Sequence, residues 1–259
     1  MDKKFDSAET NSNFQNHLFL RLIAKNQSFS KVNFKYSMFE NSYIRNCRFD
    51  SCDFTGCQFI GTNMHGSTFS GCRFDYATFE RTLIDSGILD TECPGFENLK
   101  SRFARTLRIN YQQLGDAVAA NKAMKVELKA AEIHYFKSWK SNESYYRNKY
   151  HGVRRITSFF EWSSFKILDL IWGNGESPWK LCRFVFVVML GMTVLDVVKF
   201  SDPVRLDSYG RALASAPQVF LGVLAPDNYG KLYLTAITLF RLVFIGFFLS
   251  IIIKKFNRR

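Results

Sequence analysis

Side chains that carry most catalytic chemistry are sparse in this sequence of 259 residues, and their spacing matches no catalytic motif. The histidines lie far apart and at no metal-ligand spacing: His17, His65, His134 and His151. The sequence shows no glycine-rich phosphate loop and no serine or cysteine nucleophile motif. We therefore expect no enzyme activity, no cofactor and no metal centre.

Cationic and aromatic side chains are concentrated in the middle of the chain. Residues 1–95, 96–155 and 156–259 carry formal net charges of −1, +8 and +5, so the middle supplies most of the total of +12. Three explanations fit this pattern: a site for single-stranded nucleic acid, where bases stack on rings and phosphates meet cations; attraction to an anionic membrane surface; or a solvated helical face. The candidate ligand-binding residues are Lys100, Arg102, Arg105, Arg108, Tyr145, Tyr146, Arg147, Lys149, Arg154 and Arg155.

One charge interrupts the most apolar segment. Residues 232–253 contain only Arg241 as a charged residue, and at about 1.5 Å per residue they span roughly 33 Å, enough for a hydrocarbon core of about 30 Å. A midplane arginine costs at least a few kcal/mol facing lipid, so Arg241 should face an aqueous pore or an acidic or carbonyl partner. Gly246 stands where a pore-lining helix would hinge, although Gly246 and Ser250 also form a small-xxx-small packing contact.

The N-terminal third shows a regular repeat. A large apolar residue recurs at every fifth position: Phe29, Phe34, Phe39, Ile44, Phe49, Phe54, Phe59, Met64, Phe69, Phe74, Phe79, Ile84 and Leu89. A mostly small residue precedes each by two places. This period fits neither the helix nor the strand. It predicts a square solenoid in which each face takes five residues and equivalent side chains stack inside.

The repeat resembles the pentapeptide-repeat family, whose motif has a small residue two places before a central Leu or Phe. The resemblance implies a right-handed quadrilateral β-helix over residues 27–93, with residues 1–26 as an N-terminal cap. Cys47, Cys52, Cys57 and Cys72 occupy the small inward position. We expect these thiols to be buried and reduced, which favours the cytosol.

After Pro94-Gly95 the period becomes helical. Apolar residues spaced by three and four predict a helix from residue 96 to 114 and a second from 116 to about 140, within a basic helical domain at 94–155. Residues 156–175 follow as an amphipathic segment that we expect to lie along the inner membrane interface.

Residues 176–259 predict a membrane hairpin with spans at 179–198 and 232–253. Lys180 and Arg183 begin the first span, and Lys254, Lys255, Arg258 and Arg259 follow the second. By the positive-inside rule both termini are cytoplasmic, in a multi-pass membrane protein. Between the spans, residues 207–225 predict a re-entrant pore loop, with a helix that ends near Pro217 and a returning strand at 219–225.

This arrangement resembles the two-transmembrane ion-channel superfamily, and Gly173-Asn174-Gly175-Glu176-Ser177-Pro178-Trp179 resembles the Gly-Tyr-Gly-Glu-x-Pro-Trp segment of bacterial members with N-terminal pentapeptide repeats. The resemblance implies a homotetramer. The implied pore residues are Phe220, Leu221, Gly222, Val223 and Leu224. Only Gly222 matches the potassium filter Thr-Val-Gly-Tyr-Gly, so the sequence does not support potassium selectivity.

Together these features predict an oligomeric membrane channel gated by its cytosolic domain. The architecture also resembles membrane effectors of bacterial anti-phage defence, including the Hailong type, in which an oligonucleotide signal controls a channel. That resemblance implies membrane lipid and a single-stranded oligonucleotide, or another anionic ligand, as partners. The alternative is a non-conducting membrane-anchored scaffold whose repeats form a docking surface.

Overall fold

A computed structural model describes residues 2–227 and 229–256, and the chain forms two compact units, residues 1–159 and 160–259. Its described strands are β1 (Asp2–Phe5), β2 (Glu9–Thr10), β3 (Leu18–Lys25), β4 (Ser28–Ser30), β5 (Met38–Glu40), β6 (Tyr43–Arg45), β7 (Arg48–Asp50), β8 (Gln58–Ile60), β9 (Thr68–Ser70) and β10 (Thr78–Glu80). Its described helices are α1 (Ile88–Thr91), α2 (Glu97–Gln113), α3 (Ala117–Lys140), α4 (Ser144–Lys149), α5 (Val153–Trp172), α6 (Pro178–Phe200), α7 (Leu206–Leu221) and α8 (Lys231–Phe256).

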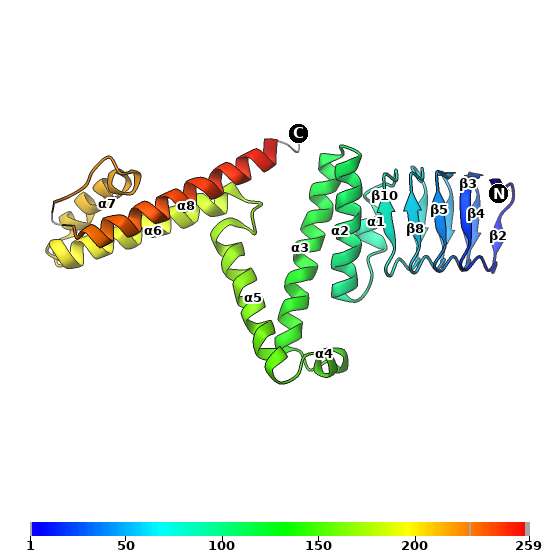
Figure 1. Cartoon of the computed structure of the whole chain (residues 1–259), viewed down its shortest axis with the longest axis horizontal. Helices are drawn as coiled ribbons and strands as arrows, with labels where there is room; N and C mark the ends of the chain where they lie inside the picture. Colours follow the sequence, from blue (N-terminus) through cyan, green and yellow to red (C-terminus); the bar gives the residue numbers. More distant parts are fainter. Residues whose placement is uncertain (1, 228, 257–259) are drawn as a thin grey trace. The chain divides into compact units, whose positions relative to one another are not determined.

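Strands of the first unit pair in parallel with strands one coil further along the chain. In one sheet Leu18 pairs with Met38, Met38 with Gln58, and Gln58 with Thr78. This sheet joins β1, β3, β5, β8 and β10, while β2, β4, β7 and β9 form another (Figure 1). Paired residues are always 20 positions apart in the sequence, which is four times the repeat period of five. The structure therefore confirms a β-helix in which each coil has four five-residue faces.

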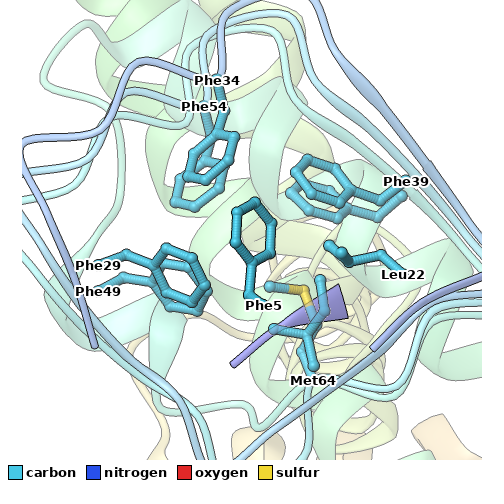
Figure 2. A pocket seen from close by; sticks show the side chains of 10 residues that line it. Phe5, Leu22, Phe29, Phe34, Phe39, Phe49, Phe54 and Met64 are labelled. Carbon is cyan, nitrogen blue, oxygen red and sulfur yellow. The ribbon is translucent and has the colours of Figure 1, made fainter. Parts of the chain in front are cut away.

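The core of the β-helix consists of stacked aromatic rings. Ring centroids lie 4.8 Å apart for Phe29 and Phe49, 5.2 Å for Phe34 and Phe54, and 5.0 Å for Phe39 and Phe59. Figure 2 shows these columns on three sides of the coil and Met64 on the fourth. Each fully buried phenylalanine contributes roughly 1.5–3 kcal/mol of transfer free energy. The large apolar residues that recur at every fifth position are therefore the residues that form this core.

The small inward residues bond to the previous coil. The Ser37 hydroxyl donates to the carbonyl of Phe14 at 2.6 Å and accepts from the amide of His17 at 2.9 Å. Cys57 repeats the first of these contacts, with Sγ 2.8 Å from the carbonyl oxygen of Phe34. The four cysteines of the repeat are free and buried, and burial raises the pKa of Cys57 to about 12. Its thiol is therefore protonated at neutral pH.

The N-terminal residues differ from the predicted cap. Residues 2–26 form part of the β-helix, because β1 pairs with β3 and β2 pairs with β4. The register of β1 shifts between Asp2 and Lys4, which places Phe5 opposite Ala24. The Phe5 ring lies among the core side chains, 5.4 Å from the ring of Phe29 (Figure 2). The phase shift hid this coil from the fivefold pattern.

Helix α2 closes the other end of the β-helix with polar side chains. The amide of Phe79 donates to Thr106 at 3.0 Å, that of Arg81 to Gln113 at 3.1 Å, and that of Thr82 to Asn110 at 2.7 Å. The three acceptors are spaced by four and three residues, so they share one face of α2. They supply the partners that a further strand would have given to β10.

The second unit contains α6, α7 and α8, packed around a small apolar core. Leu181, Met192, Phe220, Phe244 and Ile251 are among its buried residues. Among the described residues, α6 and α8 are the helices long and apolar enough to span a membrane, by length and composition. They enclose the predicted spans at 179–198 and 232–253.

The segment between these helices differs from the predicted re-entrant loop. We predicted that the helix would end near Pro217 and that 219–225 would form a returning strand, and this was wrong. Helix α7 contains Pro217 and continues to Leu221. It ends because Gly222 adopts a left-handed conformation with φ of 78°, which glycine tolerates best. Residues 222–225 form a turn and irregular backbone.

Candidate functional sites

The structure divides the predicted ligand-binding residues into several groups. Arg105 and Arg108 lie on α2 and form ion pairs with the buried Glu127 of α3, each through Nε at 2.8 Å from a carboxylate oxygen. Two cations on one buried carboxylate join α2 to α3. These arginines therefore have a structural role in the hairpin.

A second group packs α4 against α3. Tyr146 is buried, and its hydroxyl lies 3.3 Å from Nδ1 of His134, while the Tyr150 hydroxyl lies 3.2 Å from Nε2. Burial, and then the charge of Lys149, lower the pKa of His134, and burial raises the pKa of Tyr146 to about 12. Arg155 donates through Nε to the carbonyl of Trp139 at 2.5 Å. These contacts pack α4 and the first turn of α5 against α3.

A third group remains accessible, and we call it the cationic-aromatic cluster: Tyr76, Phe96, Arg102, Tyr145, Lys149 and Tyr150. The Arg102 guanidinium lies 5.5 Å from the ring centroid of Tyr76. The Lys149 ammonium lies 5.3 Å and 5.6 Å from the rings of Tyr145 and Tyr150. These are cation–π distances, and a hydrogen bond to Tyr145 raises the pKa of Lys149. The cluster combines the exposed rings of Tyr76 and Phe96 and two half-buried tyrosine rings with two exposed cations.

Three members of this cluster, Tyr76, Phe96 and Tyr150, are absent from the predicted ligand-binding residues. Tyr76 lies at a corner of the β-helix and is 55% exposed, and Phe96 precedes α2 and is 61% exposed. The available signal was that Tyr36 and Tyr76 put aromatic rings at left-handed corner positions, where the repeat otherwise has small or polar residues and Lys or Arg. Of the other predicted residues, Arg147 and Arg154 are exposed and Lys100 is half-buried.

The predicted pore residues lie at the C-terminal end of α7. Phe220 is buried in the core of the second unit, and Leu221, Gly222, Val223 and Leu224 are exposed. From α8, the Arg241 guanidinium reaches Gly222: a Cβ atom added to this glycine would lie 2.9 Å from Cζ and closer still to Nη1. Arg241 thus meets the end of a helix, where carbonyl groups and the helix dipole attract cations. The same test at Gly246 finds no atom within 4 Å.

Contacts within the second unit join the turn before α6 to the end of α8. Lys180 of α6 bonds to both carboxylate oxygens of Asp169 at 2.8 Å. Glu176 forms an ion pair with Lys254, and the rings of Trp172 and Phe247 stack with centroids 4.2 Å apart. These contacts hold the turn against the C-terminal half of α8.

Among residues 2–227 and 229–256 there is no group of three or more His, Cys, Asp or Glu side chains placed to hold a metal ion.

Comparisons with other proteins bear on the β-helix. Residues 34–87 match the family described as pentapeptide repeats (9 copies), and the chain thus carries pentapeptide repeats followed by an α-helical region. A solved structure of QnrB1, a plasmid-mediated fluoroquinolone resistance protein, is similar at 15% identity and a TM-score of 0.22. This similarity covers 30% of the present chain and 53% of the QnrB1 chain. Among curated proteins, none matches this sequence.

Proposed function

We propose that this protein is an oligomeric ion channel of a bacterial inner membrane, gated by its cytosolic β-helix and helical domain. The observation that carries the proposal is the exposure of two long apolar helices. The apolar windows of α6 and α8 have mean hydropathies of 2.2 and 2.5, yet only 22% and 17% of these windows is buried. Apolar surface of this extent needs a cover, and a bilayer supplies one.

The charges support an orientation. Lys180 and Arg183 lie in the first turns of α6, and Lys254 lies near the end of α8. Because these helices are antiparallel neighbours in the hairpin, their cations lie at the same end, and the positive-inside rule then makes both termini cytoplasmic. Exposed Ile156, Phe160 and Ile167 of α5 would contact the inner interface.

The position of α7 supports conduction. This helix lies between the two spans in the chain and packs against α6 and α8. Its end carries Leu221 and Val223, which are 62% and 80% exposed. In a tetramer these ends would meet near the symmetry axis, and the Arg241 guanidinium behind Gly222 would make the path unfavourable for cations.

The test is conductance of the purified full-length protein in planar bilayers. We expect channel events from the parent, and a shift of the reversal potential in a KCl gradient when Arg241→Ala removes the guanidinium. Lys199→Ala, an exposed cation near the other end of α6, is the matched control. Silence from all three proteins, with insertion confirmed by resistance to carbonate extraction, would contradict the channel proposal.

Silence would instead favour the second candidate, a membrane-anchored scaffold. Two observations favour it: Phe220 is buried in the core, and Gly222 alone matches the potassium filter. The β-helix would then be the docking surface, with Leu18 and Ile23 among its exposed apolar residues.

We propose an anionic ligand for the cationic-aromatic cluster, and a single-stranded oligonucleotide fits because its bases stack on exposed rings. Binding of a labelled short oligonucleotide should weaken with salt and fall at least fivefold in Arg102→Gln and Lys149→Gln. Lys129→Gln, an exposed cation of α3, should bind as the parent does. Binding that resists salt, or equal binding by all variants, would contradict this site. The resemblance to anti-phage effectors makes defence the proposed setting, and protection of expressing cells from phage tests it.

A further inference from the structure

A polar cavity of about 420 Å³ lies in the second unit, between the C-terminal end of α6, the linker that follows and the first half of α7. Its lining combines both signs of charge with serine hydroxyls, and includes Asp196, Asp202, Arg205, Ser208 and Arg211. A cavity lined in this way suits a ligand that itself carries both charges.

Ser208 offers the cavity a hydroxyl group. The residue as a whole is only 6% exposed. It lines the cavity from the first turn of α7, the end of a helix at which the dipole is positive. A phosphate oxygen in the cavity would accept its hydrogen bond.

The arginines beside Ser208 are available to the same anion. Arg205 and Arg211 pair with Asp202 and Asp207 at 3.5 Å and 3.1 Å, and all four side chains are more than half exposed. Exposed pairs of this kind contribute little stability and exchange partners readily. A phosphate could therefore take an arginine from its carboxylate, and would leave that carboxylate free for a cation.

Asp196 supplies the negative side of the cavity. One of its oxygens accepts a hydrogen bond of 2.6 Å from the Tyr229 hydroxyl, which fixes the carboxylate. Burial and this carboxylate raise the pKa of Tyr229, so the tyrosine stays a donor. The second oxygen of Asp196 is left for a ligand cation such as an ammonium group.

Aromatic residues at this end of the second unit indicate its depth in the bilayer. The rings of Phe200 and Tyr229 stack at 5.1 Å, and Tyr229 meets Tyr233 at 5.3 Å. Tyrosines gather at the headgroup level of bilayers. The neighbouring Val204 and Leu206 are 89% and 87% exposed, as expected for side chains that reach acyl chains.

We propose that this cavity binds the zwitterionic headgroup of a phospholipid, with the phosphate at Ser208 and the arginines and the ammonium group at Asp196. The inference rests on the proposed membrane location of α6 and α8, and it does not depend on conduction. Phosphoethanolamine is the headgroup that carries both groups with the least bulk.

The test measures binding of dihexanoyl phosphatidylethanolamine to the full-length protein in detergent by isothermal titration. Dihexanoyl phosphatidylglycerol keeps the phosphate without the ammonium, and free phosphoethanolamine keeps the headgroup without chains. We expect the ethanolamine lipid to bind at least fivefold more tightly than the glycerol lipid. Comparable binding of free phosphoethanolamine would identify the headgroup alone as the determinant, and much weaker binding would show that the chains contribute; both results support the site.

Substitutions test which residues bind the phosphate of the headgroup and which bind its ammonium group. Asp196→Asn, which can still accept the Tyr229 hydrogen bond, should abolish the preference between the two lipids. Ser208→Ala should weaken both by at least fivefold, and Asp227→Asn, an exposed carboxylate outside the cavity, should change neither. Equal binding of the two lipids to the parent, or parent-like binding by Asp196→Asn and Ser208→Ala, would overturn the proposal. Carbonate extraction of cell membranes is measured separately, so a failure of the membrane location is recognised independently.

Discussion

The Arg241 guanidinium occupies the space where a side chain at Gly222 would begin. Arg241 lies in the middle of α8, and Gly222 ends α7 in a left-handed conformation. The two residues are thus matched: the arginine meets the carbonyl end of α7, and the glycine leaves room for it. This contact within one chain places the half-buried guanidinium of Arg241 at the C-terminal end of α7, and it is compatible with a pore nearby.

Gly222→Ala should therefore displace the arginine. The added methyl group collides with Arg241, and a left-handed alanine costs about 1–2 kcal/mol by itself. We expect a lower midpoint of thermal unfolding in detergent and a change in any single-channel current. For the unfolding midpoint, Gly246→Ala, which meets nothing within 4 Å in this chain, is the control. Equal midpoints for the two variants would contradict the contact.

Asn110→Ala should destabilise the junction between the β-helix and α2. The Asn110 side chain accepts from the amide of Thr82 at 2.7 Å and donates to its carbonyl at 2.8 Å, and both residues are buried. Loss of one buried partner costs about 1–3 kcal/mol. We expect a lower unfolding midpoint in urea, with Gln112→Ala, a neighbouring exposed residue, close to the parent. An unchanged midpoint for Asn110→Ala would show that β10 does not need this cap.

Tyr111→Phe should stabilise the folded protein, in contrast to Asn110→Ala. Tyr111 is 2% exposed, and within the described part of the chain its buried hydroxyl has no hydrogen-bond partner. Removing the hydroxyl keeps the ring and relieves a desolvation cost of about 1 kcal/mol. We expect a higher urea midpoint than in the parent. A lower midpoint would indicate that a water molecule bonds to this hydroxyl.

Prediction of the structure from the sequence was most complete where local packing alone determines which residue type fits each position. The rungs from Phe29 to Leu89 follow from a single period, because every coil repeats the same packing. The prediction was less complete where contacts between residues far apart in the sequence determine the structure. The pairing of Arg105 and Arg108 with Glu127 depends on how α2 meets α3. The approach of the Phe96 and Tyr145 rings to 6.0 Å depends on how α4 packs against α3. Our prediction that the helix would end near Pro217 was wrong because a proline removes only one amide donor, and a helix packed against its neighbours tolerates that loss.

Acid should loosen the contact between α3 and α4 through His134. Burial and the nearby Lys149 lower the pKa of His134 from its ordinary value of 6.5, so the folded protein binds this proton less readily than the unfolded chain. The stability from neutral His134 is therefore complete above pH 6.5, and is lost as the pH falls through the folded-state pKa. We expect the urea midpoint to fall between pH 7.5 and 5.0, less steeply in His134→Gln than in the parent. His151→Gln changes an exposed histidine and should keep the parental slope. The same slope in all three proteins would mean that other groups cause the acid sensitivity.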